Sequence, residues 1–297
     1  MRPYLLYLLL LAFPCTTLGL TFLIPDRGNI IGGVQTVESQ RGESLGDIGR
    51  RFDIGIYEMI EANPKVNPWS IGSGKKITIP TQFILPPGPK SGIVINLAEM
   101  RLYFYHPDQK LVTTHPIGIG RKGWRTPIGT AKIIQKKKDP AWYPPDSIRE
   151  SYERKGKSLP NVVPPGPDNP LGQFAMRISI PGYLIHGTNK PGGIGVRSSS
   201  GCIRMYPEDI ESLFYKTKLG TQVSIVHIPY KVGKKNGHYF IEAHEPLSEK
   251  YYQNVSQQEM FKKAFEDANA SSLHVQDWDD AEDMIDQSNG LPMAISY

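Results

Sequence analysis

Residues 183–211 read YLIHGTNKPGGIGVRSSSGCIRMYPEDIE, and this segment is the most informative part of the chain. An apolar, strand-like run leads into His186, and a loop rich in glycine and serine follows. Cys202 comes sixteen residues after His186, directly before a second apolar run and the start of a helix. Because regular elements are rigid supports, we expect the imidazole and the thiol to face one cleft of a mainly β protein.

A thiol beside an imidazole suits nucleophilic catalysis. A free thiol has a pKa of about 8.5, so little thiolate exists near neutral pH. The His186 imidazole can take the proton from Cys202 during attack and return it to a leaving amine. Backbone N–H groups near Gly201 and Cys202 are expected to hold the developing oxyanion, with Ser200 and Gly187 as further loop candidates.

Each of these two residues also has an ordinary structural explanation. A lone histidine beside glycine is often a satisfied structural group, and a lone cysteine beside Ile203 is often part of a core. The cysteine count favours chemistry, because Cys15 precedes an expected cleavage site and Cys202 would then be the sole thiol of the mature chain. The other histidines show no metal-ligand spacing, so we expect no metal.

The first nineteen residues are typical of an export signal. Arg2 provides a positive start, and residues 4–13 are apolar but too few to span a bilayer as a helix. Thr17 and Gly19 place small residues at the positions that signal cleavage requires. We expect cleavage after Gly19 and a periplasmic mature protein, with an uncleaved membrane anchor as the alternative.

Charge is distributed unevenly along the chain. The net charge is +5, but residues 241–297 carry 12 acidic and 3 basic side chains, which leaves +14 for the remainder. A basic body suits an anionic polymer. No nucleic-acid-binding motif is present, and an exported chain is not expected to meet nucleic acid.

Residues 35–81 have the pattern of a small separate unit. A short strand precedes Ser44, which can cap a helix with Asp47 in an approximate capping box. A second helix ends at Asn63, before proline, and residues 77–79 alternate as a closing strand. The pattern predicts a strand–helix–helix–strand (βααβ) unit.

This unit resembles a LysM module. The matching features are Val37, Gly42-Glu43-Ser44-Leu45, Ile48, Asn63-Pro64, and Gly74 before Ile77-Thr78-Ile79-Pro80. LysM modules bind glycan that contains N-acetylglucosamine in peptidoglycan or chitin, so the resemblance implies a glycan-binding function. A structural spacer is the alternative.

The rest of the chain is read as a linker, a strand-rich domain and a tail. Proline holds residues 82–91 extended. Strand-like segments follow at residues 93–95, 102–105, 111–119, 130–134, 175–180, 183–185 and 223–228. Residues 207–217 form the one convincing helix, and residues 136–171 form a long loop that we expect to act as a lid or substrate wall. The acidic tail, 238–297, is expected to be a packed appendage or partly disordered.

The strand-rich part, residues 92–228, resembles the L,D-transpeptidase catalytic domain, also called YkuD. The matching segments are His186-Gly187, Ser199-Ser200-Gly201-Cys202-Ile203-Arg204, Ile119-Gly120, Thr126-Pro127-Ile128-Gly129 and Asn169-Pro170-Leu171-Gly172. The resemblance implies a β-sandwich domain without a cofactor, with Cys202 as nucleophile and His186 as general acid and base. The whole layout, with the tail segment 241–247, is similar to Gram-negative periplasmic members.

One position departs from the usual motif. Many members have histidine where Ser200 stands here, which leaves His186 as the only motif histidine. Arg204 stands where others have asparagine. We expect Arg204 to orient the Cys202 loop or a substrate carboxylate, with Arg197 and Asn189 as weaker substrate-binding candidates and a structural salt bridge as the alternative.

The resemblance implies a two-step exchange on peptidoglycan. Cys202 attacks the tetrapeptide stem at meso-diaminopimelate and releases D-alanine, and an amine then takes the acyl group. The amine belongs either to another stem, which gives a 3–3 crosslink, or to the terminal lysine of an outer-membrane lipoprotein. A hydrolase that uses the same pair and a non-catalytic wall-binding protein remain as alternatives.

Overall fold

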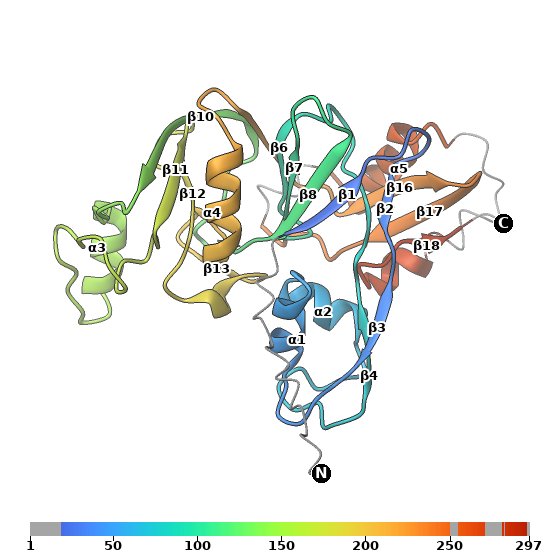
Figure 1. Ribbon diagram of the computed structural model, residues 1–297, viewed down its shortest axis with the longest axis horizontal. Helices are drawn as coiled ribbons and strands as arrows, with labels where there is room; N and C mark the ends of the chain where they lie inside the picture. Colours follow the sequence, from blue (N-terminus) through green and yellow to red (C-terminus); the bar gives the residue numbers. More distant parts are fainter. Residues whose placement is uncertain (1–18, 250–254, 271–280, 282, 296–297) are drawn as a thin grey trace, which may run out of the picture.

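The computed structural model describes residues 19–249, 255–270, 281 and 283–295 (Figure 1). The expected export signal, apart from Gly19, and Cys15 lie outside these residues. Within the described ranges, no helix has both the length and the apolar character that crossing a membrane requires.

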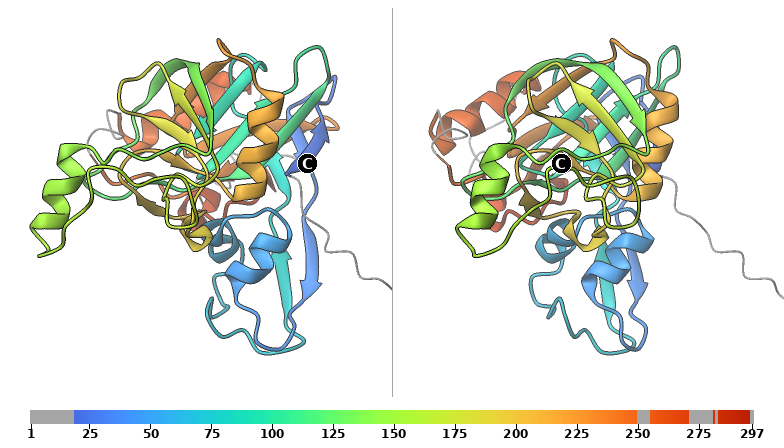
Figure 2. Two further views of the ribbon diagram at one scale, coloured as in Figure 1. Left: turned by 60° about the vertical axis from the view of Figure 1, so that its left-hand side comes forward. Right: turned by 90° about the vertical axis from the view of Figure 1, so that its left-hand side faces the viewer.

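A nine-stranded mixed sheet forms the centre of the molecule and curls round on itself (Figures 1 and 2). Its order is β1-β8-β7-β6-β15-β10-β11-β12-β14. The strands are β1 Leu20–Leu23, β6 Gly92–Asn96, β7 Arg101–Tyr105, β8 Leu111–Pro116, β10 Gly129–Lys138, β11 Phe174–Ile178, β12 Leu184–His186, β14 Ile203–Arg204 and β15 Gln222–Val226. A short parallel pair, β9 (Ile119–Gly120) and β13 (Arg197–Ser199), completes this part. The predicted mainly β class is confirmed.

Helix α4 (Pro207–Lys216) packs on the sheet through one apolar face. Ile210 and Leu213 join Met176 of β11 and Ile185 of β12 in the main buried core. The helix ends at Lys216, one residue before the expected end, because the backbone of Thr217 is extended; the Thr217 hydroxyl donates to the Leu213 carbonyl oxygen at 2.8 Å.

Residues 35–79 have the predicted strand–helix–helix–strand order: β3 Gln35–Glu38, α1 Leu45–Arg51, α2 Ile56–Ala62 and β4 Lys76–Ile79. Ser44 and Asp47 form the expected capping box. The unit is less separate than the sequence indicated. Leu45 and Met59 belong to the same buried cluster as Tyr103 of the central sheet, because so small a unit has too few apolar residues to bury a core alone.

The linker expected over residues 82–91 is shorter in the structure. Gln82–Ile84 form strand β5, which pairs antiparallel with β2 (Ile30–Gly32). Phe83 is buried and packs edge-on against Tyr103, with ring centroids 6.5 Å apart. Only residues 87–91 form an exposed connection.

The C-terminal appendage begins at Tyr230 rather than at residue 238. Strands β16 (Tyr230–Lys235) and β17 (His238–Ala243) form a hairpin, β18 (Met293–Ala294) extends it, and helix α5 (Gln257–Asp267) covers it with a separate apolar core. Buried Lys231 pairs with Glu99 at 2.9 Å and with Glu242 at 2.7 Å. The described part of the appendage is therefore packed and tied to the central sheet.

Candidate active site

Strand register places Cys202 and His186 on one face of the sheet. Strands β12 and β14 are parallel, with Ile185 opposite Ile203 and His186 opposite Arg204. The two isoleucines are fully buried in the core, so the alternation of side chains turns His186, Arg204 and Cys202 to the other face. Because Cys202 directly precedes β14, the thiol and the imidazole come from neighbouring segments, offset by two residues along the strand direction.

The His186 ring is buried, with 4% of the residue exposed, and the backbone fixes its orientation. Its Nδ1 lies 2.6 Å from the carbonyl oxygen of Gly187, a contact that a proton on Nδ1 satisfies and that leaves the lone pair on Nε2. Burial, together with the charge of Arg204, lowers the pKa of His186 to about 3, against the opposing carbonyl groups of Gly187 and Leu171. The ring is neutral at neutral pH, which is the form that a general base needs.

Cys202 is half-buried, and its Sγ lies 3.8 Å from the carbonyl oxygen of Gly182. Burial raises the pKa of the Cys202 thiol, although the Leu184 backbone amide and the charges of Arg204 and Arg177 act in the opposite direction. The resting pair is thus a neutral thiol and a neutral imidazole. Proton transfer to His186 has to accompany the attack of the sulfur.

The turn before Cys202 depends on glycine at position 201. Gly201 has a φ of +109°, and a Cβ there would lie 3.0 Å from the Arg125 carbonyl oxygen. The Gly201 N–H donates to Ser199 Oγ at 3.0 Å, and Thr126 Oγ1 donates to the Gly201 carbonyl oxygen at 2.8 Å. The Gly201 N–H already donates to Ser199 Oγ. Of the two backbone N–H groups expected to hold the oxyanion, the Cys202 amide is therefore the better candidate.

Arg121 contacts the Cys202 loop and was not singled out in the sequence. Its Nη1 donates to Ser200 Oγ at 2.9 Å and to the Ser199 carbonyl oxygen at 3.3 Å. Its guanidinium lies over the Trp124 ring, 4.6 Å from the centroid. The one sequence signal for Arg121 was its position directly after Ile119-Gly120.

The predicted substrate-binding residues differ in their contacts and in their exposure. Arg204 has a buried Nε with no hydrogen-bond partner among the residues described, and burial lowers the pKa of its guanidinium. Arg197 instead forms an ion pair with Glu249, with Nη1 and Oε2 3.1 Å apart. Asn189 is exposed. Among the residues described, Arg204 and Arg121 have no carboxylate partner, whereas Arg197 is paired with Glu249, so the first two have more capacity for an anion.

A cavity of about 480 Å³ extends to Leu184, two residues before His186. Its floor consists of outward-facing residues of β10, β11 and β12, and its walls come from the loop over residues 139–171. The lining residues are Gln135, Lys137, Asp139, Pro140, Ala141, Tyr143, Pro165, Leu171, Ala175, Arg177 and Leu184. Because the Leu184 amide also faces Cys202 Sγ, the cavity ends beside the thiol. Residues 139–171 of the predicted loop line this cavity, whereas residues 136–138 belong to β10, and the role of the loop as a lid or substrate wall stays a prediction.

Buried Asn169 stabilises the conformation of this loop through hydrogen bonds. Its Nδ2 donates to the Pro140 carbonyl oxygen at 2.8 Å and to the Pro164 carbonyl oxygen at 3.1 Å, and its Oδ1 accepts from the Leu171 amide at 2.9 Å. The same loop includes helix α3 (Asp146–Glu153), which projects from the main body (Figure 2).

Comparisons with known proteins agree with this geometry. Residues 90–225 match the L,D-transpeptidase catalytic domain, YkuD. The chain is similar to the protein named "Probable L,D-transpeptidase YcfS" of Escherichia coli strain K12, with 43% identity over 237 residues, 77% of this chain and 74% of that one. It is also similar to "Probable L,D-transpeptidase ErfK/SrfK" of the same strain, with 41% identity over 78% of this chain and 76% of the relative.

Among solved structures, the catalytic domain of the L,D-transpeptidase from E. faecium aligns with a TM-score of 0.35 and 23% identity, over 46% of this chain and 95% of that one. The family assignment rests on the sequence relatives, which match at more than 40% identity over about three quarters of both chains. The chain belongs to the L,D-transpeptidase family.

Proposed function

We propose that the protein is a peptidoglycan L,D-transpeptidase of the periplasm with Cys202 as nucleophile. The main support is the neighbouring position of the Cys202 thiol and the neutral His186 imidazole, within the matched domain and at the end of a cavity. The donor is a tetrapeptide stem, and the scissile bond joins meso-diaminopimelate to D-alanine. No step needs a cofactor or a metal.

The reaction proceeds in two steps, acylation of Cys202 and transfer of the acyl group to an amine. The sulfur of Cys202 bonds to the diaminopimelate carbonyl carbon while His186 Nε2 takes the thiol proton, and the Cys202 amide holds the oxyanion. His186 returns the proton to the leaving nitrogen, the C–N bond breaks, D-alanine departs and a thioester remains. An acceptor amine then attacks the thioester, its proton passes through His186 to the sulfur, and the thiol is restored.

The cationic side chains of the site suit the charge of the donor. Arg204 and Arg121 lie beside the Cys202 loop, where a guanidinium can form two parallel hydrogen bonds with the terminal carboxylate of D-alanine. Arg177 and Lys137 line the cavity, and we assign them to the remaining carboxylates of the stem.

Incubation with purified disaccharide-tetrapeptide tests the reaction and identifies the acceptor. We expect free D-alanine and dimers with a 3–3 crosslink, detected by mass spectrometry. A peptide that ends in the C-terminal lysine of an outer-membrane lipoprotein is added in a second reaction, and an adduct there indicates anchoring. Tripeptide without dimer or adduct would show a hydrolase and contradict the transferase proposal.

We also propose that residues 35–81 bind glycan as a LysM module. Trp69 is 76% exposed in the loop between α2 and β4, and an exposed indole offers a flat apolar face to a sugar. Trp69→Ala is expected to weaken retention on isolated sacculi by roughly tenfold, on the order of the 1–2 kcal/mol of one aromatic contact. Tyr215→Ala, which removes a 63% exposed aromatic on α4, is the control. Equal retention of both variants would favour a spacer.

Finally, we propose export and cleavage after Gly19, which makes Leu20 the first residue of the mature protein. The support is that β1 begins at Leu20 and pairs in full register with β8 from that residue onward.

A further inference from the structure

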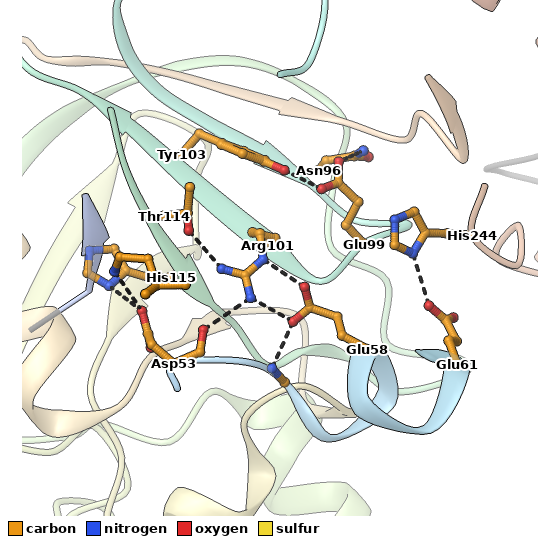
Figure 3. Close-up of polar contacts among 12 residues, drawn as sticks. Asp53, Glu58, Glu61, Asn96, Glu99, Arg101, Tyr103, Thr114, His115 and His244 are labelled. Carbon is orange, nitrogen blue, oxygen red and sulfur yellow. Dashed lines mark hydrogen bonds and ion pairs between the residues drawn. The ribbon is translucent and has the colours of Figure 1, made fainter. Parts of the chain in front are cut away.

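Three buried polar side chains meet where the βααβ unit, the central sheet and α4 come together. Asp53 follows α1, His115 lies on β8 and Asp209 lies in the first turn of α4. His115 Nδ1 is 3.1 Å from Asp209 Oδ1 and 3.7 Å from Asp53 Oδ2. Each of the three residues is at most 2% exposed, and Figure 3 shows Asp53 and His115 side by side.

This cluster has two carboxyl groups and no cation of its own. Neither Asp209 oxygen, nor His115 Nδ1, has a hydrogen-bond partner among the residues described. Burial raises the pKa of Asp209 to about 7 and that of Asp53 well above its usual range, and lowers the pKa of His115 to about 4. Asp53 and Asp209 also lie close enough to raise or lower each other's pKa, and a buried carboxylate is costly unless it shares a proton or meets a cation, so the arrangement has room for a cationic partner.

The nearest cations are already paired. Arg101 binds Glu58 through two contacts of 2.7 and 2.9 Å, and it donates to Asp53 only at the backbone carbonyl oxygen, at 3.1 Å (Figure 3). Arg50 pairs with Glu208 at 3.2 Å, at the surface. The charges of these two arginines favour the ionised carboxyl groups, but among the residues described neither arginine forms an ion pair with Asp53 or Asp209.

The backbone nitrogen of Leu20 points into the cluster. It lies 3.4 Å from Asp53 Oδ2, and Leu20 pairs with Thr114, the neighbour of His115 on β8. Gly19 lies against the His115 ring, and a Cβ on Gly19 would be 2.1 Å from His115 Cε1. The bond that export processing is expected to cut therefore lies at Asp53 and His115, and Asp209 Oδ1 lies 3.1 Å from His115 Nδ1.

We propose that Asp53, Asp209 and His115 form a binding site for the α-ammonium group of the processed N-terminus at Leu20. Hydrolysis of the Gly19–Leu20 bond gives a carboxylate on the departing Gly19 and an ammonium on Leu20, which changes one uncharged N–H into three donors with a positive charge. The three donors match the three acceptors. This inference rests on the proposed cleavage after Gly19 and is independent of the transpeptidase reaction.

The consequence is that processing completes the fold. The ammonium joins β1 to Asp53 of the βααβ unit and to Asp209 of α4 by a buried, charge-assisted contact. A chain with any residue before Leu20 keeps a neutral peptide N–H at this point and leaves the carboxyl groups without a counter-ion. The mature chain is therefore more stable than one that is longer by a single residue.

The test compares chains that differ only at the N-terminus. A cleavable fusion yields one chain that starts at Leu20, one that starts at Gly19, and an Nα-acetylated form of the first. We expect the free Leu20 chain to melt about 5 °C above the other two, on the order of the shift that two kilocalories per mole produce in a chain of this size. Its α-amine is expected to resist acylation at neutral pH, measured by peptide mass spectrometry.

Asp53→Asn and Asp209→Asn are the matched variants. In both, we expect a smaller difference in melting temperature between the free Leu20 chain and the extended chain. Equal melting of the free and extended wild-type chains, or an α-amine that reacts as fast as that of an unstructured peptide, overturns the proposal. A stoichiometric metal that is lost on chelation and on Asp209→Asn overturns it in favour of a metal site. A different first residue in the periplasmic protein overturns both the processing step and this site, while the muropeptide assay remains a separate test of the enzyme.

Discussion

Cys202→Ala is expected to lower D-alanine release from tetrapeptide substrates by at least about a thousand-fold, because the sulfur is the atom that forms the thioester. Removal of the nucleophile in a comparable hydrolase costs about a million-fold in kcat, and the remainder comes from binding and the oxyanion site. The measurement is the rate of D-alanine release, together with the intact mass of the acylated enzyme. Retained release, or retained function of the variant on sacculi, would support the non-catalytic wall-binding hypothesis.

Two further measurements separate chemistry from structure. The melting temperature is expected to change little in Cys202→Ala, since the side chain is small and only half-buried. Alkylation of the wild-type thiol by iodoacetamide is expected to rise with pH, with a midpoint above the ordinary cysteine value, because burial raises the pKa of Cys202. Below that midpoint the thiol keeps its proton, so neutral-pH activity depends on His186, and His186→Gln is expected to lose activity without moving the alkylation midpoint downward. A midpoint near pH 5 or 6 would indicate a preformed thiolate and contradict this mechanism.

Local pattern was sufficient for much of the fold. The hairpin β6–β7 and helix α4 followed from alternation, from the proline at the first turn and from helical spacing. Strands β1, β2 and β5 were not predicted, because runs of three or four residues carry little periodic signal and depend on distant partners for stability. The β16–β17 hairpin had a readable signal in Asn236-Gly237, both with positive φ, which is the turn that such hairpins favour.

The candidate site, like the fold, was predictable from the sequence only in part. Cys202 and His186 lie in one short motif, so the sequence alone predicts their chemistry. The contact of Arg121 with Ser200 joins residues 79 positions apart, and that of Arg101 with Glu58 joins residues 43 apart. A local sequence pattern cannot predict contacts between residues so far apart. For this reason the βααβ unit was expected to be separate, although it shares a buried cluster with the central sheet.

Glu58→Gln is expected to lower the free energy of unfolding by about 3–5 kcal/mol, because it leaves a buried guanidinium without its partner. Arg101 is fully buried, and Glu58 accepts from its Nε at 2.7 Å and its Nη2 at 2.9 Å. An arginine cannot escape the cost by losing its proton. Denaturant unfolding measures the change, and Glu208→Gln is the control, because the partly exposed Arg50–Glu208 pair also joins the unit to the catalytic domain and is worth about 1 kcal/mol at most. Similar losses in both variants would contradict the assignment.

The same substitution is expected to reduce activity, because Glu58 also supports the loop between His186 and Cys202. Its Oε2 accepts from the Gly55 amide at 2.8 Å, and Gly55 packs so closely on Gly195 of that loop that a Cβ on Gly195 would lie 2.4 Å from the Gly55 Cα. The Tyr57 amide donates to the Gly195 carbonyl oxygen at 3.3 Å, so the start of α2 holds the loop from outside. We expect kcat to fall in Glu58→Gln, at a temperature where the variant is folded, and to stay unchanged in Glu208→Gln. A destabilised Glu58→Gln enzyme with full kcat would mean that the βααβ unit stabilises the fold without positioning the catalytic loop.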